Sequence, residues 1–131
     1  MRLRAINPSP WLQHFGVNHA VEVRGGERVL HVSGQTSTSG DGTPLHADDL
    51  VAQFSEAWSN LEKVLAEAEM GAANIVRLVV YTTDVQAFMA QADALVPVWT
   101  EAGARPACTL LEVAGLFDPT LLGEIEATAV A

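Results

Sequence analysis

Glu124, a carboxylate near the C-terminus with Glu126 two residues after it, is the side chain with the clearest potential for chemistry. The two carboxylates alternate with Ile125 and Ala127 at the two-residue period of a strand, so both point to one face of a sheet. That face must meet water or a polar cavity made with a partner chain. A carboxylate beside an apolar pocket has a raised pKa, which suits proton transfer near neutral pH. The alternative is that Glu124 is only a charged side chain in a solvated cavity.

The sulfur and imidazole groups predict no metal site. Cys108 is the only cysteine, so it cannot form a disulfide within the chain, and the four histidines are isolated. None of these residues has the spacing of zinc ligands. The sequence places no cation or histidine to stabilise a Cys108 thiolate. We therefore interpret Cys108 as a small buried hydrophobic side chain rather than a nucleophile.

Composition and charge exclude several classes of function. About half of the 131 residues are apolar, and this length suits one domain over residues 1–131. The formal net charge is −9 and the seven basic residues are scattered along the chain, so we expect no nucleic acid and no membrane as partner. No apolar run approaches the ~20 residues that span a bilayer. Residues 1–8 lack the apolar stretch of a signal peptide, which predicts a cytoplasmic protein.

The first predicted elements are a hairpin and a long helix. Residues 19–23 alternate apolar and polar side chains, Gly25-Gly26 makes a turn, and residues 28–33 form the second strand. Residues 34–47 have the composition of a loop. Asp48 and Asp49 then begin a helix whose apolar residues recur every three or four positions. Gly71 is expected to close this helix as a left-handed cap.

A β-branched strand over residues 75–82 follows the first helix. Asp84 can cap a second helix, which Pro97 is expected to kink and Gly103 to end. Two strands complete the order β-β-α-β-α-β-β. Two helices on one face of a four- to six-stranded sheet predict a two-layer α+β sandwich.

The second face of the sheet is expected to be mixed in polarity. Alternation along the strand over residues 107–114 places Cys108, Leu110 and Glu112 together on that face, and the last strand runs over residues 122–130. Mixed faces are often covered by another subunit, which predicts a homo-oligomer. A face open to solvent is the alternative.

Four stretches, taken in order, resemble the RidA/YjgF family of small trimeric proteins from about residue 14 to residue 130. They are Val32-Ser33-Gly34-Gln35, the helix with Gln53 and Asn60-Leu61, Arg105 to Thr109 with Glu112-Val113-Ala114, and Glu124 to Val130. The resemblance implies a chorismate-mutase-like fold and a homotrimer with a central barrel. It also implies a cleft for a small-molecule ligand at each subunit interface. Family members with the complete site hydrolyse enamines and imines to a 2-keto acid and ammonia, without a cofactor.

The chain departs from the family at the residue that grips the substrate carboxylate. The family has an arginine after Pro-Ala, which suits a bidentate clamp, and Cys108 stands there instead. Arg105 lies about 10 Å away along a strand and on its other face, so we expect it in a surface or interface ion pair. Val17 stands where the family has a tyrosine, and Ala92 where it often has an asparagine.

Other parts of the family's site are retained. The resemblance makes Glu124 the residue that positions or activates water, and assigns ligand contacts to Ser33, Gly34 and the backbone of Leu110. Ser33 has the alternative role of hydrogen-bonding the turn after its strand.

Two functions follow from the resemblance. The first is a RidA-like hydrolytic deaminase of a small imine, enamine or related C–N compound, with a specificity changed by Cys108. The second is a non-catalytic trimer that binds a small molecule in the same cleft. Phe15 and Trp99 either line that cleft or fill it. Some relatives are called endoribonucleases, but the acidic charge argues against that activity here.

Overall fold

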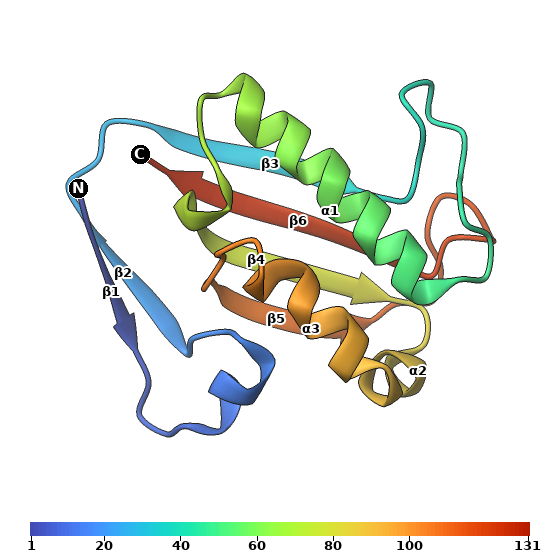
Figure 1. The fold of residues 1–131 in the computed structure, drawn as a ribbon, viewed down its shortest axis with the longest axis horizontal. Helices are drawn as coiled ribbons and strands as arrows, with labels where there is room; N and C mark the ends of the chain where they lie inside the picture. The colour runs from blue at the N-terminus through green and yellow to red at the C-terminus, as the bar shows by residue number, and fades with distance from the viewer.

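A four-stranded sheet with the strand order β3-β6-β4-β5 forms one layer of the structure, a computed structural model that describes residues 1–131. Helices α1, α2 and α3 pack together on one face of this sheet (Figure 1). The predicted two-layer α+β fold is therefore confirmed. The elements of the two layers are β3 (Val29–Gln35), α1 (Leu50–Glu67), β4 (Ile75–Thr82), α2 (Val85–Ala90), α3 (Ala92–Thr100), β5 (Ala107–Glu112) and β6 (Gly123–Val130).

Helix α1 supplies most of the helical contribution to the core. The Asp49 side chain accepts a hydrogen bond from the Ala52 N–H at 3.1 Å and caps the first turn. Its apolar stripe buries Leu61 and Leu65 completely against the sheet. The prediction for its C-terminus is wrong, because Gly71 has an extended backbone with φ −135°. The left-handed conformation after α1 belongs to Glu69, whose φ is 58°.

The second predicted helix is divided into α2 and α3. Asp84 caps α2 by accepting a hydrogen bond from the Ala87 N–H at 2.9 Å, as predicted. The break falls at Gln91 rather than at Pro97, which lies inside α3. Pro97 has no N–H to donate to the carbonyl of Asp93, four residues earlier in the helix. Asp93 is exposed to solvent, so its carbonyl can bond to water instead. Gly103, with φ 93°, follows the end of α3.

The predicted hairpin of residues 19–33 does not form. Strand β2 (Ala20–Arg24) pairs instead with β1 (Arg2–Ile6), an element that the sequence did not predict. These two strands make a separate ribbon beside the four-stranded sheet (Figure 1). Gly25 and Gly26 both have positive φ, and the chain then turns so that the Glu27 and Arg28 N–H groups donate to the Ala131 carbonyl. β3 therefore pairs with the C-terminal strand β6 and not with β2.

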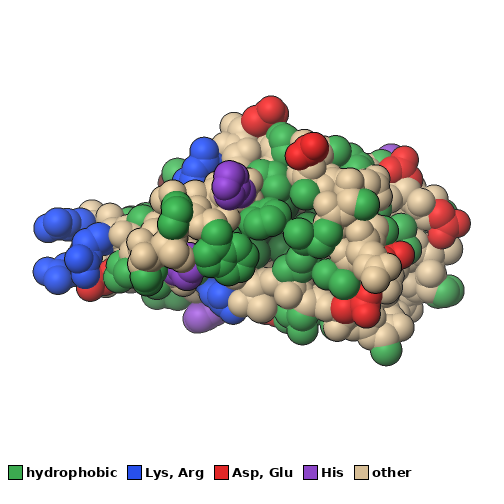
Figure 2. All heavy atoms as spheres, turned by 90° about the horizontal axis from the view of Figure 1, so that it is seen from below, with side chains coloured by type: hydrophobic (Ala, Val, Ile, Leu, Met, Phe, Trp, Pro, Cys, Tyr) green, Lys and Arg blue, Asp and Glu red, His purple; other side chains and the backbone are tan.

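Basic side chains are not scattered as expected, since three of the seven gather on the ribbon. Arg4 and Arg24 both form ion pairs with Glu22, at 3.2 and 2.9 Å, and Arg2 lies opposite Arg24 in the strand register. Figure 2 shows this basic group at one end of the molecule, while acidic side chains are spread over the opposite end. No helix combines the length and apolar character needed to cross a membrane.

The strand register corrects the predicted face of Cys108 and Leu110. Cys108 pairs with Leu78 and Leu110 pairs with Val80, and both partners are buried in the core under the helices. Paired residues of neighbouring strands share a face, so these residues lie on the helix-covered side. They do share one face with Glu112, as the alternation predicted, but it is not the open face.

Candidate functional site

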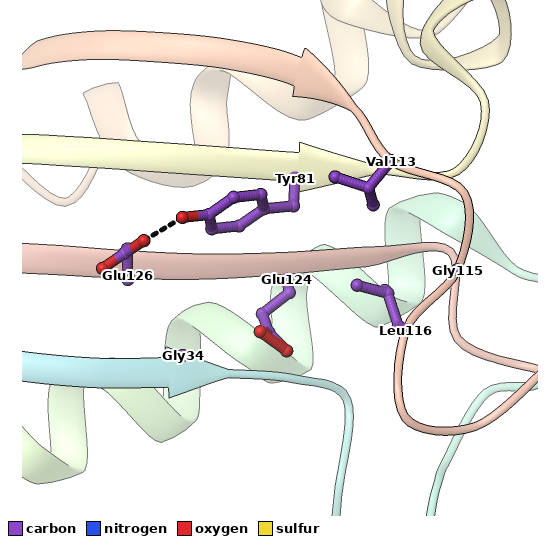
Figure 3. Close-up of a pocket in the computed structure, with 7 residues that line it drawn as sticks. All are labelled: Gly34, Tyr81, Val113, Gly115, Leu116, Glu124 and Glu126. Carbon is purple, nitrogen blue, oxygen red and sulfur yellow. Dashed lines mark hydrogen bonds between the residues drawn. The ribbon is translucent and has the colours of Figure 1, made fainter.

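A polar pocket of about 290 Å³ lies on the open face of the sheet (Figure 3). Three strands contribute residues to it, β3 through the backbone of Gly34, and the segment after β5 closes one end. We call it the carboxylate pocket, and its residues are Gly34, Tyr81, Val113, Gly115, Leu116, Glu124 and Glu126.

Glu124 and Glu126 lie on the open face because β6 alternates between buried and half-buried residues from Gly123 to Ala129. Ile125 and Ala127, between and after them, are buried under the helices. In Figure 3 the Tyr81 ring lies alongside β6 and its hydroxyl reaches Glu126. Tyr81 is paired with Glu124 in the register, yet its hydroxyl donates to Glu126 two residues along the strand. This hydrogen bond leaves Glu124 without a protein donor.

The electrostatics of the pocket favour proton transfer at Glu124. Partial burial, and then the negative charge of Glu126, raise the pKa of the Glu124 carboxyl above its ordinary value of 4.5. The hydrogen bond to Glu126 raises the pKa of the Tyr81 hydroxyl, so this group stays a donor at neutral pH. The Glu124 carboxylate accepts no hydrogen bond from any other group of the chain, because the Tyr81 hydroxyl donates to Glu126 instead, so its two oxygens are free to bind water or a ligand.

Gly34 provides the space for the Glu124 carboxylate. A Cβ on Gly34 would lie 2.5 Å from Glu124 Oε2, closer than any ordinary contact. The chain passes Glu124 at this point through an irregularity in the β3–β6 register between Val32 and Gln35. The neighbouring Ser33 is exposed, and its hydroxyl makes no hydrogen bond within the chain, so it does not brace the turn.

A buried glutamine on α1 fixes the start of β6. Gln53 is 1% exposed, and its amide donates to the carbonyls of His46 and Thr120 at 3.0 and 2.8 Å. Its carbonyl accepts the Leu122 N–H at 2.7 Å, two residues before Glu124. All three of these hydrogen bonds join the Gln53 side chain on α1 to a loop. Gln53 is thus a positioning residue for the carboxylate pocket.

A second pocket, of about 410 Å³, lies on the helix-covered side beside β5. Phe15, Val17, Cys108 and Leu110 all line it, and ten of its eleven lining residues are hydrophobic. We call it the apolar pocket. The remaining walls come from α2, α3 and a short 3₁₀ helix, η1 (Trp11–Phe15).

The N-terminal wall of the apolar pocket is held against α3. The Trp99 indole N–H donates to the Phe15 carbonyl at 2.9 Å. Gly16 follows with φ 68°, a left-handed conformation that favours glycine, and a Cβ there would lie 2.1 Å from the Thr100 methyl carbon. Trp99 therefore lines the pocket and supports its wall without filling it.

No charged side chain lines the apolar pocket. Burial raises the pKa of the Cys108 thiol to about 11, and the more distant charge of Arg77 opposes this only in part. Cys108 is a neutral thiol at pH 7, in agreement with its interpretation as a hydrophobic side chain. Arg105 does not form the predicted ion pair within the chain. Its guanidinium donates to the carbonyls of Thr100 and Ala104, at 3.2 and 2.8 Å, away from Cys108.

The structure divides the predicted site residues between the two pockets. Gly34 and Glu124 belong to the carboxylate pocket, with Ser33 beside it, and the Phe15, Val17, Cys108 and Leu110 group belongs to the apolar pocket. Ala92 lines neither of the two. β4 separates β5 from β6, and the two pockets open on opposite faces of the sheet. One chain alone therefore cannot bring Glu124 and Cys108 to the same ligand.

Sequence reasoning missed Tyr81 and gave Glu126 no role in the site. The two-residue period of the strand over 75–82 was a sufficient signal, because it places Tyr81 opposite the buried Val80 and Thr82. The missing information was the strand order, which sets β4 beside β6. No group of three or more His, Cys, Asp or Glu side chains is placed to hold a metal ion.

Comparisons with known proteins agree with this fold. The family model described as endoribonuclease L-PSP matches residues 16–131. The chain belongs to this family, whose solved members include the Rid and YjgF proteins. No curated protein sequence matches the chain.

Two solved structures illustrate the likeness. The first is a protein of unknown function of the conserved Rid family, YyfB from Yersinia pestis, with 35% identity over 100% of both chains and a TM-score of 0.86. The second is Rv2704 from Mycobacterium tuberculosis, a member of the YjgF/YER057c/UK114 family. It shares 28% identity, over 99% of this chain and 100% of that chain, with a TM-score of 0.65.

Proposed function

We propose that this chain is a subunit of a hydrolytic deaminase that acts on a small imine, enamine or related C–N compound, with Glu124 as the group that activates water. One observation carries the proposal. Glu124 is a partly buried carboxylate with a raised pKa and no internal donor, at the wall of a pocket large enough for water and a small ligand. A general base of this kind works best when its pKa lies near the working pH.

The chemistry at Glu124 needs only water and a proton acceptor. Water adds to the C=N carbon, and the carboxylate accepts one proton and returns it to the nitrogen. The resulting carbinolamine passes its hydroxyl proton to the nitrogen as the C–N bond breaks. Ammonia leaves and a carbonyl remains, so one water is consumed and no cofactor takes part. The Tyr81–Glu126 hydrogen bond favours this role for Glu124, because it occupies the neighbouring carboxylate.

The proposed active unit is a homotrimer in which the carboxylate pocket of one chain meets the apolar pocket of the next. The position of the two pockets on opposite faces of one sheet supports this arrangement. The open face of the sheet supports it too, since no layer of the chain covers that face (Figure 1). A molecular mass in solution of three times the 13.9 kDa of one chain is expected, and a stable monomer would remove the shared cleft.

Cys108 in place of the family's arginine changes the proposed specificity. A neutral thiol cannot bind a carboxylate as a guanidinium fork does. Simple 2-imino acids are therefore expected to be poor substrates. RNA is not a proposed substrate, because a formal charge of −9 opposes the phosphate backbone.

The direct test follows imine loss with the intact protein. 2-Iminobutyrate and an imine without a carboxylate are generated in situ, and hydrolysis is compared for the parent and for Glu124→Gln. Glu124→Gln is expected to lower kcat/KM by about 100-fold or more. Glu62→Gln, an exposed change on α1, controls for the loss of one negative charge. An unchanged rate in Glu124→Gln would remove the assigned base.

The second candidate is a non-catalytic trimer that binds a small molecule in the same cleft. The wholly uncharged lining of the apolar pocket favours it, because nothing in that pocket orients a charged reacting group. Ligand binding without acceleration of any imine's hydrolysis would identify this function.

A further inference from the structure

The apolar pocket is a formed cavity with a hydrophobic mouth. Two large side chains at its rim are well exposed, Trp11 at 59% and Met89 at 46%. The Trp11 ring is held edge-on to His19, with 6.0 Å between ring centroids. Figure 2 shows hydrophobic side chains gathered on this lower face of the molecule, between the basic ribbon and the acidic end. Exposed apolar groups around a cavity are typical of a binding site.

The volume and walls of the pocket suit a ring-sized group. Its 410 Å³ lies within the range of about 300–1,000 Å³ for small-molecule sites. A closed apolar cavity of about 150 Å³ already binds benzene. Aromatic side chains enter the wall from two directions, Phe15 from η1 and Phe88 from α2, and offer ring edges and faces to an aromatic ligand.

The pocket offers no charged side chain to an anion. The Trp99 indole N–H, a possible donor, is already bonded to the Phe15 carbonyl. Two arginines are engaged in hydrogen bonds within the chain: Arg77 donates at 2.8 Å to the hydroxyl of Thr109, the one lining residue that is not hydrophobic, and Arg105 donates to backbone carbonyls. A carboxylate in this pocket would lose its hydration without gaining a charged partner, which disfavours its binding.

We infer that the apolar pocket receives an uncharged aromatic or branched aliphatic group of the substrate. The substrate is then a C–N compound with a hydrophobic substituent that enters the apolar pocket and carries no carboxylate. This inference rests on the proposed function, and it names the substrate class that the Cys108-containing half of the site selects. The carboxylate pocket of a neighbouring chain places Glu124 near the C=N carbon at the other end of the substrate.

Binding of a matched pair of probes tests the inference without requiring turnover. Benzamide and benzoate share a ring and differ mainly in charge, and their affinities for the parent protein can be measured by calorimetry. Benzamide is expected to bind at least tenfold more tightly than benzoate. Cys108→Arg, which adds a guanidinium to the pocket, is expected to reverse the preference. Equal or tighter binding of benzoate to the parent would overturn the inference.

Two neighbouring leucines locate the binding. Leu110→Trp fills the apolar pocket, whereas Leu111→Trp changes the next residue of β5, which points to the opposite face of the sheet. Only Leu110→Trp is expected to abolish benzamide binding, with both variants first shown to retain the parent's mass in solution. Benzamide binding that survives in Leu110→Trp would contradict the assignment to this pocket.

Turnover separates the inference from the proposed function. Benzaldimine, which yields benzaldehyde and ammonia with water, is compared with 2-iminobutyrate, and a kcat/KM at least tenfold higher for benzaldimine is expected. Faster hydrolysis of 2-iminobutyrate would overturn the substrate class and leave the deaminase function intact. Benzamide binding with no hydrolysis of either imine would support the ligand class and remove the deaminase.

Discussion

Gly34 and Glu124 touch across the β3–β6 pair so closely that a single added methyl group on Gly34 would collide with the Glu124 carboxylate. A Cβ on Gly34 would lie 2.5 Å from Glu124 Oε2. The obstructed atom is the end of a flexible side chain, so Glu124 can move away at little cost to packing. The position of the carboxylate, rather than the stability of the fold, depends on this glycine.

Gly34→Ala is therefore expected to reduce imine hydrolysis by about tenfold or more while leaving the unfolding temperature nearly unchanged. Gly123→Ala is the matched control, because a Cβ there would lie 2.4 Å from the ring of the buried Phe54. The control is expected to lower the free energy of unfolding by about 1–3 kcal/mol through overpacking. Thermal unfolding and imine assays on both variants check the contrast. Equal losses of stability would contradict it.

Glu124 is also expected to make stability depend on pH. Its pKa is raised in the folded state, so between 4.5 and that raised value the folded chain binds more protons at this group than the unfolded chain. Stability therefore falls as pH rises through this window, and the loss persists at higher pH. Glu124→Gln removes the effect and is expected to raise the urea midpoint at pH 7 but not below pH 4. A pH-independent difference between variant and parent would refute this account.

Gln53→Met tests the support of β6. The change leaves the His46 and Thr120 carbonyls and the Leu122 N–H without their partner in a buried region. It is expected to lower the free energy of unfolding by about 2–4 kcal/mol, because unpaired buried polar groups lose their hydration. Urea unfolding measures the change. Gln86→Met, an exposed change on α2, serves as control and should stay within about 0.5 kcal/mol of the parent.

Mixed oligomers test whether two chains share one site. Glu124→Gln removes the proposed base from one pocket, and Leu110→Trp blocks the other pocket. Each variant alone is expected to be inactive, but chains unfolded and refolded together in equal amounts should recover about one quarter of the parent's sites. Imine hydrolysis by the mixture measures the recovery. No recovery would mean that each chain uses only its own residues.

The sequence predicted the two-layer fold because the periods of its apolar residues are strong. The stripe on α1 and the alternation in β6 each determine which face is buried. The N-terminal region was not predictable in the same way. Residues 20–24 alternate as a strand whichever partner they take, and the choice of β1 over β3 depends on how Gly25 and Gly26 direct the chain. Glycine pairs permit several turns, so local sequence leaves the pairing open.

The candidate site shows a similar limit. The two-residue period was enough to set Glu124 and Glu126 on one face, and to group Cys108 with Leu110. The two-residue period could not decide which of the two faces of β5 points toward the helices, because β5 has few strongly buried residues. That single choice separates Cys108 from Glu124. The contact of Tyr81 with Glu126 depends on strand order, which local sequence patterns do not encode.

The thickness of the sheet keeps the two pockets structurally independent. Residues around Cys108 pack among η1, α2 and α3, while Glu124 is placed by β3, β4 and the hydrogen bonds of Gln53. A substitution that reshapes one pocket therefore leaves the walls of the other in place. The residues that line the apolar pocket can change without moving the carboxylate of Glu124.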